Sequence, residues 1–171
     1  MAATTRTSRV FVSHLSGTTV FDRDGDRVGR VRDVVVTLHA SRTTPPRVLG
    51  LVIEVQGRRR IFLPMTRVTA IDAGQVIITG LINMRRFQQR GTETLVIGEL
   101  LDRQVTLIAS DETVTVRDIA MEPARAREWE IHKLYVERPG KGLRRRGETF
   151  TVEQARLGSD HAPGQAAHPQ L

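Results

Sequence analysis

The chain has 171 residues, enough for one domain or two very small ones, and its lack of cysteine excludes disulfides and thiolate metal sites. Hydrophobic residues make up 39% of the chain but aromatic residues only 4%, so a core must be built from Val, Ile and Leu, which favours strands. The net charge of +7 comes almost wholly from arginine, a side chain that pairs bidentately with phosphate and carboxylate groups.

Apolar runs of strand length, separated by turn residues, dominate the first half of the sequence. They predict strands over residues 10–12, 18–21, 28–38, 47–55, 61–63 and 76–79. Short strands at this spacing are typical of a small barrel or sandwich. Residues 80–90 have a weak helical period and are predicted to form a short helical connector.

The charged stretch between the second and third predicted strands has the spacing of a calcium loop at three positions, Asp22, Asp24 and Asp26. An EF-hand loop needs a glycine at its sixth position to bend sharply, and here that position is Arg27. Asp24 and Gly25 instead supply the positive φ of a tight hairpin turn. We therefore predict a turn, with Gly25 as a structural residue, and no metal site.

A second copy of the strand pattern follows the connector. Residues 104–123 align with 19–38, so that the segment VRDV at 31–34 matches VRDI at 116–119. With small changes in loop length, residues 48–54 fall on 131–137 and residues 58–60 on 144–146. Three consecutive matches indicate two diverged copies of one β-module.

These patterns predict an all-β fold of tandem small β-barrels, and leave open whether the copies form one merged barrel or two. The predicted organisation is a flexible N-terminus, a first module, a second and shorter module, and a disordered tail poor in large apolar residues. The expected boundaries are 1–8, 9–89, 90–152 and 153–171.

One acidic residue recurs on an apolar strand face in both copies. Strand alternation places Asp33 on the side of Val31 and Val35, and Asp118 takes the same place in the second copy. A carboxylate on such a face needs hydrogen bonds or a cation. We interpret both as structural residues, with a binding or switch role as the alternative.

The sequence lacks the patterns that carry catalysis. Its five histidines lie far apart, and it contains no nucleophile elbow, phosphate-binding loop or dinucleotide fingerprint. We therefore expect a non-catalytic protein that needs no cofactor.

Arginine clusters are the remaining candidates for binding. Two triplets each follow a predicted turn, and a further pair lies in the connector. Such clusters can bind phosphate or an acidic protein surface, or they can protect an edge strand by charge. The candidate residues are Arg58, Arg59, Arg60, Arg144, Arg145, Arg146, Arg85 and Arg86.

Two stretches, "GTTVFDRDGDRVGRVRDVVV" and "VLGLVIEVQGRRRIFLPMTRV", resemble a PRC-barrel domain. Together with "ITGLINMRRF", "ETLVIGELLDRQVT" and "LRRRGETFTV", they are similar to the cytoplasmic N-terminal region of actinobacterial MgtE-type magnesium transporters. The resemblance covers about residues 8–152. In that family a helical domain, CBS modules and a membrane domain follow, so the resemblance implies neither transport by this polypeptide nor a magnesium-sensing residue in it.

The leading hypothesis is a docking or regulatory module whose partner is an MgtE-type transporter or another macromolecular complex. We expect a cytoplasmic location, at the inner membrane only through a partner, because no apolar run approaches the length of a membrane span. The alternative is a basic β-barrel protein that binds RNA or the ribosome. Self-association is also left open.

Overall fold

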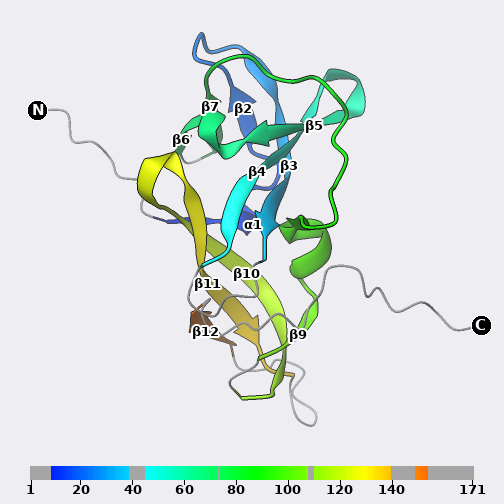
Figure 1. Ribbon diagram of the computed structural model, residues 1–171, viewed down its shortest axis with the longest axis vertical. Helices are drawn as coiled ribbons and strands as arrows, with labels where there is room; N and C mark the ends of the chain where they lie inside the picture. Colours follow the sequence, from blue (N-terminus) through cyan, green and yellow to red (C-terminus); the bar gives the residue numbers. More distant parts are fainter. Residues whose placement is uncertain (1–8, 39–44, 73, 108–109, 140–148, 154–171) are drawn as a thin grey trace, which may run out of the picture.

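The computed structural model describes residues 9–38, 45–72, 74–107, 110–139 and 149–153, the last of these as backbone only (Figure 1). Strands account for most of the ordered elements, and the all-β prediction is confirmed. The strands are β1 (Val10–Phe11), β2 (Thr19–Phe21), β3 (Arg27–Thr37), β4 (Arg47–Val55), β5 (Arg59–Pro64), β6 (Val68–Asp72), β7 (Gln75–Ile78), β8 (Thr94–Leu95), β9 (Gln104–Thr106), β10 (Thr113–Pro123), β11 (Trp129–Glu137) and β12 (Thr149–Glu153). The helical turns are α1 (Val12–Leu15), η1 (Gln56–Arg58), η2 (Met65–Arg67), the π-helical η3 (Val96–Leu100) and η4 (Arg125–Arg127).

All twelve strands belong to one curved sheet with two halves. The first half contains β2 to β7 and the second β9 to β12, and β11 meets β4 where Trp129 pairs with Val48 (Figure 1). The apolar side chains of both halves form one continuous buried cluster. The halves therefore share a core.

Each half also completes the sheet of the other. Strand β1 pairs with β10 of the second half, where Val10 lies opposite Met121. In the same way β8 pairs with β3 of the first half, where Thr94 lies opposite Val36. The helical turns α1 and η3 follow these two short strands directly. The two halves are thus interlocked by an exchange of their opening segments.

The two long hairpins have the same irregularities at matching positions. In β3 the register against β4 shifts between Val31 and Asp33, and again after Val35. In β10 the register against β11 shifts between Val116 and Asp118, and again after Ala120. Bulges bend a strand and increase its twist, so both hairpins curve at equivalent points.

The helical turns differ by one residue. In α1 the amide of Ser16 donates to the carbonyl of Val12, an α-helical bond at 3.3 Å. In η3 the amide of Leu101 donates to the carbonyl of Val96, five residues earlier, at 2.9 Å. This spacing makes the turn π-helical. The turn in the second half is thus one residue longer, with five residues in η3 and four in α1.

The helical-connector prediction is wrong. Residues 80–90 run in an extended path beside β5, where Arg86 forms a bridge with Ile61 and the Phe87 amide donates to the Arg60 carbonyl at 2.8 Å. Pairing with β5 satisfies backbone groups that a helix would have satisfied internally, and this tertiary contact outweighs a weak helical period.

The strand predictions also need correction. The first strand ends at Phe11 because α1 begins at Val12, and β6 and β8 were not predicted. The predicted flexible N-terminus and residues 154–171 of the predicted disordered tail lie outside the described residues, whereas Glu153, the first residue of that predicted tail, ends β12. Within the described ranges, no helix is long and apolar enough to cross a membrane.

Candidate functional site

The Asp33 carboxylate joins the two halves. The side chain is buried, and its Oδ1 accepts hydrogen bonds from the amides of Val34 at 2.8 Å and Ile97 at 2.7 Å. Its Oδ2 accepts from the amide of Gly98 at 2.9 Å. Burial raises the pKa of Asp33, and the three amide bonds oppose that rise. Asp33 therefore fastens the helical turn η3 of the second half onto β3 of the first.

Asp118 makes the reciprocal contact. Its Oδ1 accepts from the amide of Ser13 at 3.1 Å and from that of Ile119 at 2.8 Å, and its Oδ2 accepts from the Ser13 hydroxyl. Ser13 lies in α1, so this carboxylate fastens the turn of the first half onto β10 of the second. Both carboxylates thus have the hydrogen bonds that a carboxylate on an apolar strand face needs.

The raised pKa of Asp33 predicts a pH dependence of stability. A group whose pKa is higher in the folded state stabilises most below its ordinary pKa, and that contribution is lost as pH rises through the folded-state value. The free energy of unfolding of the wild type should therefore increase relative to that of Asp33→Asn as pH falls from neutral to about 4. Urea unfolding of both proteins across that range checks this; a constant difference would contradict it.

The aspartate-rich loop at the tip of the β2–β3 hairpin is a turn. Oδ1 of Asp22 accepts from the amides of Asp24 and Asp26, each at 2.9 Å, and Gly25 has φ of 88°. A φ in this region favours glycine. In the described part of the chain, no group of three His, Cys, Asp or Glu residues is arranged to hold a metal ion.

Two of the predicted arginine groups lie near each other because the connector runs beside β5, and we call this group of exposed residues the connector patch. The contacts of Phe87 with Arg60 and of Arg86 with Ile61 hold the connector beside β5, and the rings of Phe62 and Phe87 stack at 6.1 Å. Two apolar side chains accompany the arginines: Leu81 is 91% exposed and Met84 is 48% exposed. The connector patch consists of Arg58, Arg59, Arg60, Arg85, Arg86, Leu81 and Met84.

The second triplet, Arg144 to Arg146, lies outside the described residues, so the surroundings of the two predicted triplets cannot be compared. Within the described residues, the structure brings together the connector and the first triplet.

A second basic feature was missed from the sequence. A pocket of about 480 Å³ lies where β3 passes the end of β4, and its walls include Arg27, Arg30, Arg32 and Glu54. Nη2 of Arg32 donates to Oε1 of Glu54 at 3.0 Å. This bond, with the charges of Arg32 and Arg60, lowers the pKa of Glu54. We call this feature the arginine pocket.

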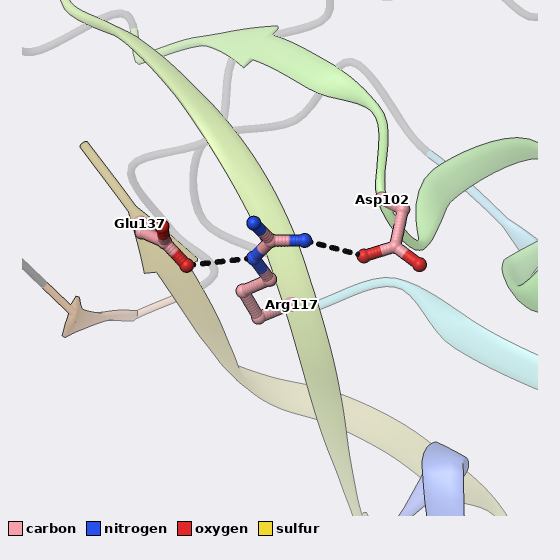
Figure 2. Close-up of polar contacts among 3 residues, drawn as sticks. All are labelled: Asp102, Arg117 and Glu137. Atoms are coloured by element: carbon pink, nitrogen blue, oxygen red, sulfur yellow. Dashed lines mark hydrogen bonds and ion pairs between the residues drawn. The ribbon is translucent and has the colours of Figure 1, made fainter. Parts of the chain in front are cut away.

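The counterpart of Arg32 in the second half has a different environment. Figure 2 shows Arg117 between two carboxylates: its Nε donates to Glu137 at 2.7 Å and its Nη1 to Asp102 at 2.8 Å. The bonds to Glu137 and then Asp102 raise the pKa of Arg117. By contrast, Nε of Arg32 is buried and has no partner among the described residues. The two equivalent arginines thus differ in how fully the chain satisfies them.

A small, curved, aliphatic-cored sheet with strand β1 exchanged between halves defines a β-barrel class of protein. Residues 8–81 match the model of the PRC-barrel domain, and residues 94–162 match that of the Actinomycetes SH3 domain. Residues 8–81 are thus similar to a PRC-barrel domain, in agreement with the resemblance seen in the sequence. For the second half, which we expected to be another PRC-barrel-like module, the matching model is a different one. No curated protein matches the chain.

Proposed function

We propose that the protein is a non-catalytic docking module that binds the acidic surface of a partner protein through the connector patch. The observation that carries this proposal is that the connector, with exposed Arg85, Arg86, Leu81 and Met84, lies beside the strand that begins with exposed Arg59 and Arg60. Nη1 of Arg59 donates to the Met84 carbonyl at 3.4 Å. Arginine and methionine are enriched at protein–protein interfaces, and a basic surface attracts a partner of opposite charge.

The composition of the connector patch favours a protein over RNA as the partner. Proteins that bind single-stranded nucleic acid stack bases on exposed aromatic rings. The aromatic rings nearest the patch, Phe62 and Phe87, are half-buried and stack on each other. An acidic protein surface needs only charge and apolar contact, and the connector patch offers both.

The resemblance to MgtE-type transporters makes the cytoplasmic side of such a transporter the first partner to test. Neither matched family model is that of a transporter, so this choice of partner depends on the sequence resemblance.

Replacing Arg58, Arg59 and Arg60 together with serine should abolish partner capture. The variant removes three charges from the connector patch without touching the buried core, because all three side chains are exposed. The loss of binding can be measured in two ways. One is to cross-link the tagged full chain to its protein partners and compare how much partner each variant captures. The other is to measure the affinity of each variant for the purified cytoplasmic region of the transporter. We expect at least about tenfold weaker binding from three lost charge-assisted contacts.

The matched control replaces Arg103, Arg125 and Arg127 with serine. These residues are also exposed, lie in the second half, and form no ion pair among the described residues. The control should bind like the wild type. An equal loss of binding in both variants would mean that net charge alone explains the effect. If the wild type captures no protein but binds RNA, and the patch variant loses that RNA binding, the RNA-binding alternative would replace this proposal.

A further inference from the structure

The arginine pocket contains more positive charge than the chain neutralises. Of its lining residues, three are arginines and one is a glutamate, which leaves two positive charges. Glu54 pairs with Arg32, while Arg27 and Arg30 form no ion pair among the described residues. A pocket of about 480 Å³ is within the size range of small-molecule sites.

In the second half, carboxylates of the chain itself bind the arginine that is equivalent to Arg32. Asp102 supplies a carboxylate to Nη1 of Arg117, and Glu137 occupies Nε. The residue equivalent to Asp102 in the first half is Gly17: the amide of Gly17 donates to the Val31 carbonyl at 2.8 Å, and that of Asp102 donates to Val116 at 2.7 Å. Gly17 has no side chain, so the first half lacks this acceptor.

The neighbouring positions differ in the same direction. Glu112 precedes β10 as Arg27 begins β3, and Thr115 takes the place of Arg30. In the second half Glu112 pairs with Arg138 at 2.8 Å, which lowers the pKa of Glu112. At these positions the second half has Asp102, Glu112 and Thr115, where the first half has Gly17, Arg27 and Arg30. One half is internally neutralised and the other is open to an anion.

We propose that the arginine pocket binds a phosphate-class oxyanion in the place that the Asp102 carboxylate takes in the second half. In the bound state, Glu54 accepts from Nε of Arg32, as Glu137 accepts from Nε of Arg117. A ligand oxygen then accepts from the Nη group of Arg32. A carboxylate has two oxygens and one charge, whereas a phosphate group has three terminal oxygens and up to about two charges. Three guanidinium groups and two uncompensated charges match phosphate. This site does not depend on the proposed docking function.

The sharpest test places a carboxylate at Gly17, the position equivalent to Asp102. Gly17 has φ of 78° and Asp102 φ of 60°, so aspartate already adopts this conformation at the equivalent position. A Cβ at Gly17 would meet nothing within 4 Å. Gly17→Asp should therefore supply the missing carboxylate and exclude the ligand without removing an arginine.

The experiment is an NMR titration of the full chain with inorganic phosphate at constant ionic strength, following the amides of Gly29 and Gln56. We expect saturable shifts confined to the pocket, and affinity at least about tenfold weaker in Gly17→Asp. The control Gly91→Asp makes the same charge change at an exposed glycine with free space, and should bind like the wild type. If Gly17→Asp does not fold, Arg30→Ser takes its place, with the same expected direction.

Three results would overturn the proposal. They are unchanged affinity in the pocket variant, equal saturation by acetate, and non-saturating shifts spread over all exposed arginines. Titration with a sugar phosphate, as a second probe, distinguishes a phosphomonoester ligand from free inorganic phosphate. Tighter binding than inorganic phosphate identifies a phosphomonoester as the ligand, and weaker binding identifies the free anion.

Discussion

Replacing Asp33 with alanine should lower the free energy of unfolding by roughly 2–4 kcal/mol. The substitution leaves three amides without an acceptor, two of them in η3. Because η3 and β8 belong to the second half but pack on β3, their release opens the shared core as well. Urea unfolding followed by circular dichroism measures the change.

Two aspartates provide controls for this substitution. Asp118→Ala removes the reciprocal contact on α1, where the carboxylate is only half-buried, and should cost less, about 1–2 kcal/mol. Asp26→Ala changes an exposed hairpin residue and should stay within about 0.5 kcal/mol of the wild type. Equal effects of Asp33→Ala and Asp26→Ala would mean that the hydrogen bonds between Asp33 and η3 do not stabilise the fold.

Replacing Gly50 with alanine should be the second most damaging change, at about 1–3 kcal/mol. A Cβ on Gly50 would lie 2.3 Å from the Leu63 carbonyl oxygen and 2.6 Å from the Phe62 ring. The Leu63 oxygen belongs to the backbone of β5 and cannot rotate away, so β4 and β5 must separate. Thermal or urea unfolding measures the loss.

The same substitution should also weaken partner binding, because Phe62 stacks on Phe87 and thereby holds the connector beside β5. Gly91→Ala is the matched control, since a Cβ there meets nothing within 4 Å and the residue is exposed. It should leave both stability and binding unchanged. A stable Gly50→Ala protein would show that β4 and β5 have more room than the structure gives them.

Much of the fold follows from local pattern. The long strands β3 and β4 were predicted almost to the residue, because each is a run of β-branched residues bounded by turn or proline signals. The matching VRDV and VRDI segments indicated where the second long hairpin begins. The exchange of β1 and β8 could not be predicted, since two-residue strands carry no periodicity and their partners lie far away in sequence.

The candidate site was predicted in part. The sequence identified the arginines of the connector patch, but a weak helical period concealed their contact with β5. The arginine pocket was missed because its arginines alternate with aliphatic residues in a strand that also carries the core. A comparison of Gly17 with Asp102 could have indicated it, because one equivalent position has a carboxylate and the other has none.

The differences between the halves suggest a division of roles. In the second half, Arg117 and Arg138 are paired with carboxylates of the chain itself. In the first half, Arg27, Arg30 and four of the five connector-patch arginines form no ion pair among the described residues, and the fifth, Arg60, lies 4.0 Å from Glu54. Binding of an anionic partner is therefore expected at the first half, with the second half as its structural support.

Native-state hydrogen exchange at Ile97 and Gly98 tests most directly whether the halves form one interlocked unit. Both amides donate to the buried Asp33 carboxylate, so they should exchange as slowly as the core amides of β3, and faster in Asp33→Ala. Fast exchange at these two amides in the wild type, beside a slowly exchanging β3, would contradict the account.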